Sequence, residues 1–230
     1  MSHQRPEGAT VVATLQALLA PTDGGTPRIA AARPDQLRPL PRIVAKVAGR
    51  VTGTGPANIF TTLGQHPRLF RVWLRYSAQL MPFGKLPRRD TELVILRVAW
   101  RCLSAYEWHQ HVPIALRVGL TAEEVKGVAV SLPANHFTLR QLALLAASDE
   151  LLAQRVLSDS TWRAVEATLD TREVIELCLL VGNYQGLAST IGGLGIQIEP
   201  DSARVVPTHR GSTIPRWKTA VRLARSTKAS

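Results

Sequence analysis

The densest run of chemically capable side chains is Ser104-Ala105-Tyr106-Glu107-Trp108-His109-Gln110-His111. On a helix that begins near Ser104, Glu107 and His111 are four residues apart and therefore project from one face. A carboxylate beside an imidazole fixes its tautomer and raises its basicity, and histidine titrates near neutral pH. We therefore predict that Glu107 orients His111, which acts as a general acid or base.

The same run also has a purely structural interpretation. Ser104 and Glu107 match the Ser-x-x-Glu pattern of a capping box, in which both side chains bind free backbone N–H groups at the start of a helix. A helix N-terminus also favours a bound anion, so a cap and a site for an acidic substrate are compatible. From the sequence, both interpretations stay open.

His109 and His111 form a His-x-His pair, which suits a metal ion when both side chains face one way on a strand. On a helix the two side chains point about 200° apart, because one turn takes about 3.6 residues. We therefore predict no metal site here, and we predict that His111 faces inward because it shares a face with Glu107. Pro113 falls inside the same helix, where it favours a kink.

The elements that carry these residues are predicted to be helices. From Ala57 to Ile198 apolar residues recur at three-to-four spacing, without a convincing alternating stretch. We therefore expect an all-α fold, with helices near 57–65, 68–81, 89–103, 105–118, 122–130, 137–153, 160–168 and 172–191.

Helix start and stop signals agree with this period. Thr121 with Glu124 and Asp170 with Glu173 form capping boxes, and Asp90 is predicted to cap the helix that contains Glu92. The run Gly192-Gly193-Leu194-Gly195 does not follow a strand, so we expect it to end the preceding helix rather than to bind a dinucleotide.

The chain of 230 residues divides into a Pro/Gly-rich arm over 1–55, with a helical piece over 42–50, a helical domain over 56–200 and a basic tail over 201–230. The formal net charge is +11, yet residues 51–200 hold fourteen basic and thirteen acidic side chains, and residues 201–230 hold seven and one. The excess therefore lies on the terminal segments. The tail could bind nucleic acid, a membrane or an acidic partner surface, or it could be a solvated tail.

Cys102 and Cys178 are the two cysteines, and each lies in an apolar stretch. We predict that both are reduced and buried, which excludes a disulfide framework and a thiolate zinc site. No apolar run approaches the roughly 20 residues that cross a bilayer, and no secretory signal is visible. We expect a cytoplasmic protein.

Three stretches resemble the carboxymuconolactone decarboxylase-like superfamily, which includes alkylhydroperoxidase D. They are Leu86–Ala99, Tyr106-Glu107-Trp108-x-x-His111 and Gly119-Leu120-Thr121-x-Glu123-Glu124-Val125. The resemblance covers roughly residues 56–200. It implies an all-helical homo-oligomer (a dimer, trimer or hexamer) with a small site around the Glu and His of the motif helices.

The alkylhydroperoxidase D branch carries the pattern Glu-x11-Cys-x2-Cys-x3-His, which selects Glu92, Ser104, Glu107 and His111 in this chain. The outer Glu and His match, and neither cysteine position does. A dithiol peroxidase needs one thiolate to attack the peroxide and a second thiol to resolve the product. The resemblance therefore favours the decarboxylase branch, which uses no cofactor and no redox cysteine, and implies that Glu92 is a further proton relay.

We therefore predict a cofactor-independent lyase or isomerase that moves protons on a small acidic or carbonyl substrate, by decarboxylation, isomerisation or lactone chemistry. His111 is the general acid or base, and Glu107 is its orienting carboxylate or a second base. The candidate substrate-binding residues are Tyr106, Arg89, Ser104, Trp108 and Tyr184. For Trp108 and Tyr184, packing in the core is the alternative.

Two other functions remain as alternatives. The first is a peroxidase-like protein that lacks the dithiol and uses Cys102 alone. The second is a non-catalytic scaffold whose basic tail contacts nucleic acid or a membrane.

Overall fold

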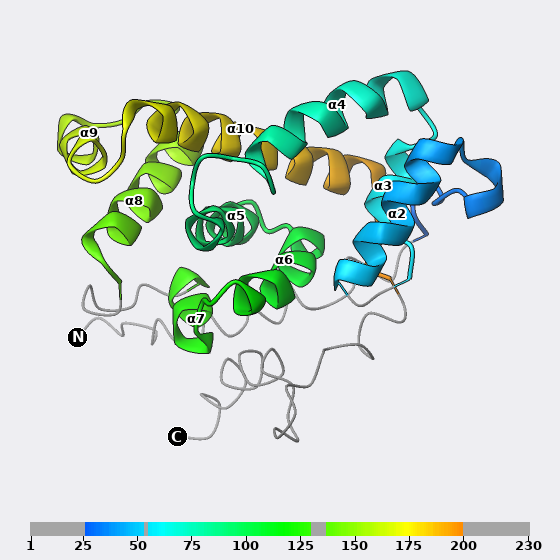
Figure 1. Ribbon diagram of the computed structural model, residues 1–230, viewed down its shortest axis with the longest axis horizontal. Helices are drawn as coiled ribbons and strands as arrows, with labels where there is room; N and C mark the ends of the chain where they lie inside the picture. The colour runs from blue at the N-terminus through cyan, green and yellow to red at the C-terminus, as the bar shows by residue number, and fades with distance from the viewer. Residues whose placement is uncertain (1–25, 53–54, 130–136, 200–230) are drawn as a thin grey trace, which may run out of the picture.

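The computed structural model describes residues 26–52, 55–129 and 137–199, and Figure 1 shows how they are arranged. These residues form a 3-10 turn (Pro34–Gln36) and helices α2 (Pro39–Thr52), α3 (Asn58–Leu63), α4 (Pro67–Leu80), α5 (Arg88–Arg101), α6 (Ala105–Arg117), α7 (Ala122–Ala129), α8 (Leu139–Gln154), α9 (Asp159–Glu166) and α10 (Thr171–Leu194). No strand occurs in these ranges. The all-α prediction is confirmed, with helix ends shifted by a few residues.

Helix α5 lies at the centre of the molecule, with α6 and α7 below it, α8 to one side and α10 above it in Figure 1. Its side chains are buried nearly all round, as expected for a helix without a polar stripe. Leu93 and Leu96 pack in an apolar cluster with α6 and α7, whereas Val94 and Ile95 pack in a second cluster with α8 and α10. This central position places Glu92 inside the protein.

Two predicted capping boxes are present. Asp170 Oδ1 accepts from the Glu173 N–H at 2.9 Å, and Glu173 Oε2 accepts from the Asp170 N–H at 2.9 Å. Thr121 and Glu124 make the same exchange at the start of α7. Gly195 ends α10 in the left-handed conformation, with φ of 65°, so the glycine run does close this helix.

The prediction that Asp90 caps α5 is wrong. The helix begins two residues earlier, at Arg88, so Asp90 lies in its first turn. Asp90 instead accepts a hydrogen bond from Arg140 Nε of α8 at 2.7 Å. Arg140 also donates to Glu173 at 2.8 Å. One guanidinium thus joins α5, α8 and the start of α10.

Replacing Arg140 with Leu is expected to lower the free energy of unfolding by about 3 kcal/mol, because two largely buried carboxylates lose their counter-charge. Urea denaturation measures this. The matched control is Arg33→Leu, which breaks an exposed pair with Asp35 and is expected to change stability by less than about 1 kcal/mol. Equal effects of the two substitutions would contradict the bridging role of Arg140.

The predicted helical piece over 42–50 is longer in the structure, since α2 covers Pro39–Thr52. Helix α2 contacts α3 and α6, which places this part of the predicted arm against the helical body. The predictions for residues 1–25 and for the tail beyond residue 199 lie outside the described residues.

Helix α10 has 24 residues and is long and apolar enough to cross a membrane by length and composition. It packs against α5 and α8, as the core helix of a folded domain does. Both cysteines are free, as predicted, but only Cys102 is partly buried and Cys178 is exposed. The prediction that Cys178 is buried is wrong. The outer face of α10 near Cys178 carries exposed apolar side chains, so the hydropathy of the sequence does not distinguish the outer face from the inner face.

Candidate active site

Glu92 on α5 is fully shielded from solvent and binds two side chains. Its Oε2 lies 2.7 Å from His111 Nδ1 of α6, and its Oε1 accepts from Arg88 at 2.8 Å. Because Glu92 Oε1 already accepts from Arg88 and Oε2 is an acceptor, His111 Nδ1 donates the hydrogen bond, and in the neutral ring Nε2 carries no proton. His111 faces inward as predicted. The carboxylate that orients it is Glu92, however, and not Glu107.

Tyr184 of α10 lies against the His111 ring. The two ring centroids are 5.3 Å apart and the ring planes are nearly perpendicular. Burial first, and then the charges of Glu92 and Glu107, raise the pKa of the Tyr184 phenol well above its usual value. The phenol therefore stays protonated and is a hydrogen-bond donor beside His111.

Among the described residues, Glu107 is the buried side chain with the most polar atoms that lack a hydrogen-bond partner. Its side chain is almost fully buried, and neither carboxyl oxygen has a hydrogen-bond partner among the described residues. Ser104 Oγ also has no partner there, and Ser104 makes no side-chain cap to α6. The capping-box interpretation of Ser104 and Glu107 is therefore wrong. A buried carboxyl without partners is expensive, and such groups concentrate at functional sites.

Burial raises the pKa of Glu107 to about 7, while the nearby Ser104 hydroxyl and the His111 ring oppose this rise. A carboxyl with this pKa is about half protonated at neutral pH, which is the condition for exchanging protons with a substrate. Glu107 therefore has the environment of a general acid or base, although it is not the group that orients His111.

A cavity of about 410 Å³ opens beside the first turn of α6. Its lining includes Cys102, Ser104 and Tyr106, together with Ala188 of α10 and Arg28. Its volume is typical of a small-molecule site. Glu92, Glu107 and His111 are not among its described lining residues. Ser104, which lies about one helical turn before Glu107, borders the cavity together with the Arg28 side chain.

Two predicted substrate-binding residues lie elsewhere. Arg89 binds Glu124 of α7 and the Gly119 carbonyl, away from Glu92. Trp108 packs 5.7 Å from Trp100 in the apolar cluster between α5 and α7, so the core alternative holds for it. The arginine that reaches Glu92 is Arg88, and its spacing of four residues from Glu92 is the sequence signal that identifies it.

Tyr106 lines the cavity, but its hydroxyl is already engaged. It donates to Glu199 at 2.7 Å and accepts from the Ile59 N–H at 3.1 Å. Glu199 also accepts from Gln110 Nε2 at 2.5 Å and from the Asn58 N–H at 2.6 Å. Glu199 therefore joins α3, α6 and the chain that follows α10.

Within the described ranges, no group of three or more His, Cys, Asp or Glu side chains could hold a metal ion. The polar groups brought together around His111 are Glu92, Arg88, Glu107 and Tyr184. Their side chains can bind an anion or exchange a proton.

The carboxymuconolactone decarboxylase family model matches residues 67–150, which include Glu92, Glu107 and His111. No curated protein sequence gives a significant match. The fold is similar to that of an uncharacterized peroxidase-related protein from Ralstonia eutropha JMP134, described as an alkylhydroperoxidase AhpD core. The two share 17% identity over 77% of this chain and 95% of that chain, with a TM-score of 0.66.

The debrominase Bmp8 is also similar in fold, with 15% identity over 79% of this chain and 96% of its own and a TM-score of 0.66. Another structure of that debrominase is a cysteine-to-alanine variant in complex with 2,3,4-tribromopyrrole. These low identities establish the shared fold. The carboxymuconolactone decarboxylase family model thus matches the part of the chain that carries the predicted motif residues, and the fold is similar to that of AhpD-like proteins, as the resemblance predicted.

Proposed function

We propose that the protein is a cofactor-independent enzyme that performs acid–base chemistry on a small acidic or carbonyl substrate. The observation that carries this proposal is Glu107, a buried carboxyl with a pKa of about 7 and no hydrogen-bond partner among the described residues. The charge of His111, whose Nδ1 is held by Glu92, in turn opposes the rise in the pKa of Glu107.

In this proposal His111 Nε2 is the base and protonated Glu107 is the acid. Nε2 takes a proton from the carbon beside the substrate carbonyl, and Glu92 stabilises the imidazolium that results. Glu107 donates its proton to the carbonyl oxygen, so a neutral enol forms. His111 then returns its proton to a different carbon while Glu107 takes back the enol O–H proton, which restores the carbonyl and completes an isomerisation.

The same residues serve a decarboxylation. Loss of CO2 from a carboxylate two bonds from the carbonyl leaves an electron pair that becomes an enolate, and the Glu107 proton neutralises the enolate oxygen. The Arg28 guanidinium at the edge of the 410 Å³ cavity supplies a positive charge for an acidic substrate.

The test is a screen of β-keto acids and carboxylated lactones in D2O, with products and deuterium incorporation followed by NMR. For a substrate so identified, His111→Gln is expected to lower turnover by about 10²–10⁴-fold. His109→Gln, which changes the neighbouring histidine on another face of α6, is the matched control and should keep turnover. Full turnover by folded His111→Gln would refute the proposal.

A thiol peroxidase reaction at Cys102 is the second candidate, because Cys102 lines the same cavity. Burial, and then the charge of Glu107, raise the pKa of the Cys102 thiol, which disfavours the reactive thiolate. We therefore expect Cys102→Ala to keep full turnover and to consume hydrogen peroxide as slowly as the unmodified protein. Rapid peroxide consumption that Cys102→Ala abolishes would instead establish the peroxidase.

A further inference from the structure

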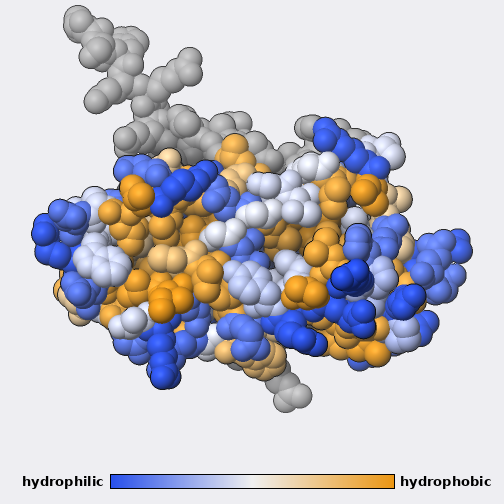
Figure 2. All heavy atoms as spheres, turned by 90° about the horizontal axis from the view of Figure 1, so that it is seen from above, coloured by the Kyte–Doolittle hydropathy of each residue, from blue (hydrophilic) through white to orange (hydrophobic). Residues whose placement is uncertain are grey.

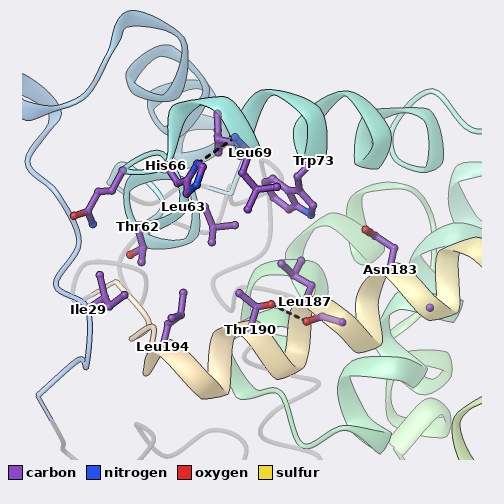
Figure 3. A pocket seen from close by; sticks show the side chains of 14 residues that line it. Ile29, Thr62, Leu63, His66, Leu69, Trp73, Asn183, Leu187, Thr190 and Leu194 are labelled. Atoms are coloured by element: carbon purple, nitrogen blue, oxygen red, sulfur yellow. Dashed lines mark hydrogen bonds between the residues drawn. The ribbon is translucent and has the colours of Figure 1, made fainter.

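A second cavity, of about 600 Å³, lies between α10 and the segment that joins α3 to α4. In Figure 3, Trp73 and Leu69 reach the cavity from α4, Leu63 reaches it from α3, and Leu187 reaches it from α10. Most of the lining is apolar. The volume falls within the range of about 300–1,000 Å³ that is usual for small-molecule sites.

This cavity is separate from the candidate active site. It shares no described lining residue with the 410 Å³ cavity, and Glu92, Glu107 and His111 do not line it. Asn183 of α10 lines it, whereas the next residue, Tyr184, lies against His111. An inference about this cavity therefore does not rest on the proposed function.

Two glycines keep part of this space open. Gly182 and Gly186 lie one turn apart on α10 and line the cavity, and a Cβ added at either would have no heavy atom within 4 Å. Glycine inside a helix destabilises it relative to alanine. Packing among the described residues does not require either glycine, so their effect there is to widen the cavity.

The described lining of this cavity has no charged side chain, which disfavours an ionic ligand. None of the described lining residues is Asp, Glu, Lys or Arg. A charged ligand would therefore give up its hydration without meeting a counter-charge, which is unfavourable. Figure 2 shows apolar side chains gathered on the face seen from above. Val72 of α4 and Leu179 of α10 are among the exposed apolar side chains of the described residues.

The lining offers acceptors as well as donors: Gln65 and Thr190 donate to the Ala30 and Gly186 carbonyls and keep acceptor oxygens, whereas three other side chains keep N–H donors. His66 Nδ1 accepts from the Leu69 N–H at 3.3 Å, so in the neutral ring Nε2 carries the proton. Asn183 Oδ1 accepts from Ser77 at 3.3 Å, which leaves its amide N–H groups. Trp73 adds an indole N–H. Donors of this kind suit a carbonyl oxygen.

We propose that this cavity binds an uncharged, mainly apolar small molecule that carries a carbonyl oxygen, such as an aromatic ketone or ester. The apolar walls supply the burial, and an N–H donor of His66, Asn183 or Trp73 binds the carbonyl oxygen.

Nile red is a suitable probe, because it is uncharged, aromatic and carries a carbonyl, and its fluorescence rises in apolar surroundings. The full-length protein is expected to bind about one Nile red per chain. Gly186→Leu fills the cavity and is expected to weaken binding by at least about tenfold. Gly193→Leu is the matched control, since Gly193 lies on the same helix, has equal room for a Cβ and does not line the cavity.

Two further measurements keep the test decisive if Gly186→Leu folds poorly. Trp73→Phe keeps an aromatic wall, removes the N–H, and is expected to weaken Nile red binding several-fold. The anionic probe 8-anilinonaphthalene-1-sulfonate is expected to bind more weakly than Nile red. The proposal is overturned if the protein binds no Nile red, if Gly186→Leu and Gly193→Leu bind it equally, or if sedimentation shows an oligomer that Gly186→Leu dissociates and Gly193→Leu does not.

Discussion

Glu107→Gln is expected to make the protein more stable at neutral and alkaline pH. The pKa of Glu107 rises from the ordinary 4.5 to about 7 on folding. Between these values the folded protein holds a proton that the unfolded chain has released, so the free energy of unfolding falls as pH rises through this window. Above about pH 7 the accumulated loss is about 3 kcal/mol. Glutamine stays neutral and avoids this loss.

Urea denaturation at several pH values measures this effect. At pH 8 the Glu107→Gln variant is expected to be about 3 kcal/mol more stable than the unmodified protein, and near pH 4.5 the two should be equal. Glu166→Gln is the matched control, because Glu166 is exposed on α9 and its replacement should change stability little at any pH. Identical unfolding curves for Glu107→Gln and the unmodified protein at pH 8 would contradict the burial of an ionisable carboxyl.

The same substitution is expected to lower turnover by about 10²–10⁴-fold, because glutamine cannot donate the proton. If Glu107 acts as the acid, turnover of the unmodified protein falls as pH rises above about 7, the pKa of this carboxyl. The residual activity of Glu107→Gln should lack this decrease. A gain in stability together with a loss of activity in Glu107→Gln would indicate that burial of Glu107 supports the reaction at a cost in the stability of the fold.

Glu92→Ala is expected to be among the most destabilising single changes, with a loss of about 3–5 kcal/mol in the free energy of unfolding. Glu92 is fully buried and accepts from both Arg88 and His111. Its removal leaves a largely buried guanidinium and an imidazole N–H without their acceptor, while the methyl group of alanine fills only part of the space.

The measurement is again urea denaturation, with Glu166→Ala as the exposed control, expected to change stability by no more than about 0.5 kcal/mol. Glu92→Gln separates positioning from charge, since it keeps the shape and an acceptor oxygen but removes the carboxylate. We expect it to fold and to lose most turnover, because the single glutamine oxygen cannot accept from both Arg88 and His111, and 15N spectra of His111 should then show that Nδ1 no longer holds the proton preferentially. A loss below about 1 kcal/mol for Glu92→Ala would contradict the buried role of Glu92.

The helices and most of their ends could be predicted because their signals are local. The boxes Thr121–Glu124 and Asp170–Glu173 act within four residues, so a short stretch of sequence contains all of the information. Asp90 shows the limit of such signals. From the sequence, its position near the start of the helix suggests an N-terminal cap. In the structure its carboxylate instead accepts from Arg140 of α8, fifty residues further along the chain.

The candidate site could be predicted only in part for the same reason. Spacing along α6 correctly placed Glu107 and His111 near each other, but the carboxylate that binds His111 comes from α5 and reaches it through the packing of two helices. The family pattern selected Glu92 but did not predict that its carboxylate contacts His111. Glu199 escaped prediction because it lies beyond the last helix, and only the folded chain brings it to Tyr106.

The most direct test is a titration of the Glu107 carboxyl itself, by 13C NMR of protein labelled at the glutamate side-chain carboxyl carbon. The unmodified protein is expected to show one glutamate resonance that titrates with a pKa of about 7 and is missing from the spectrum of Glu107→Gln. If every glutamate in the folded protein titrates below about pH 5, near the usual glutamate value, then Glu107 is not a buried proton-transfer group and the proposed chemistry fails.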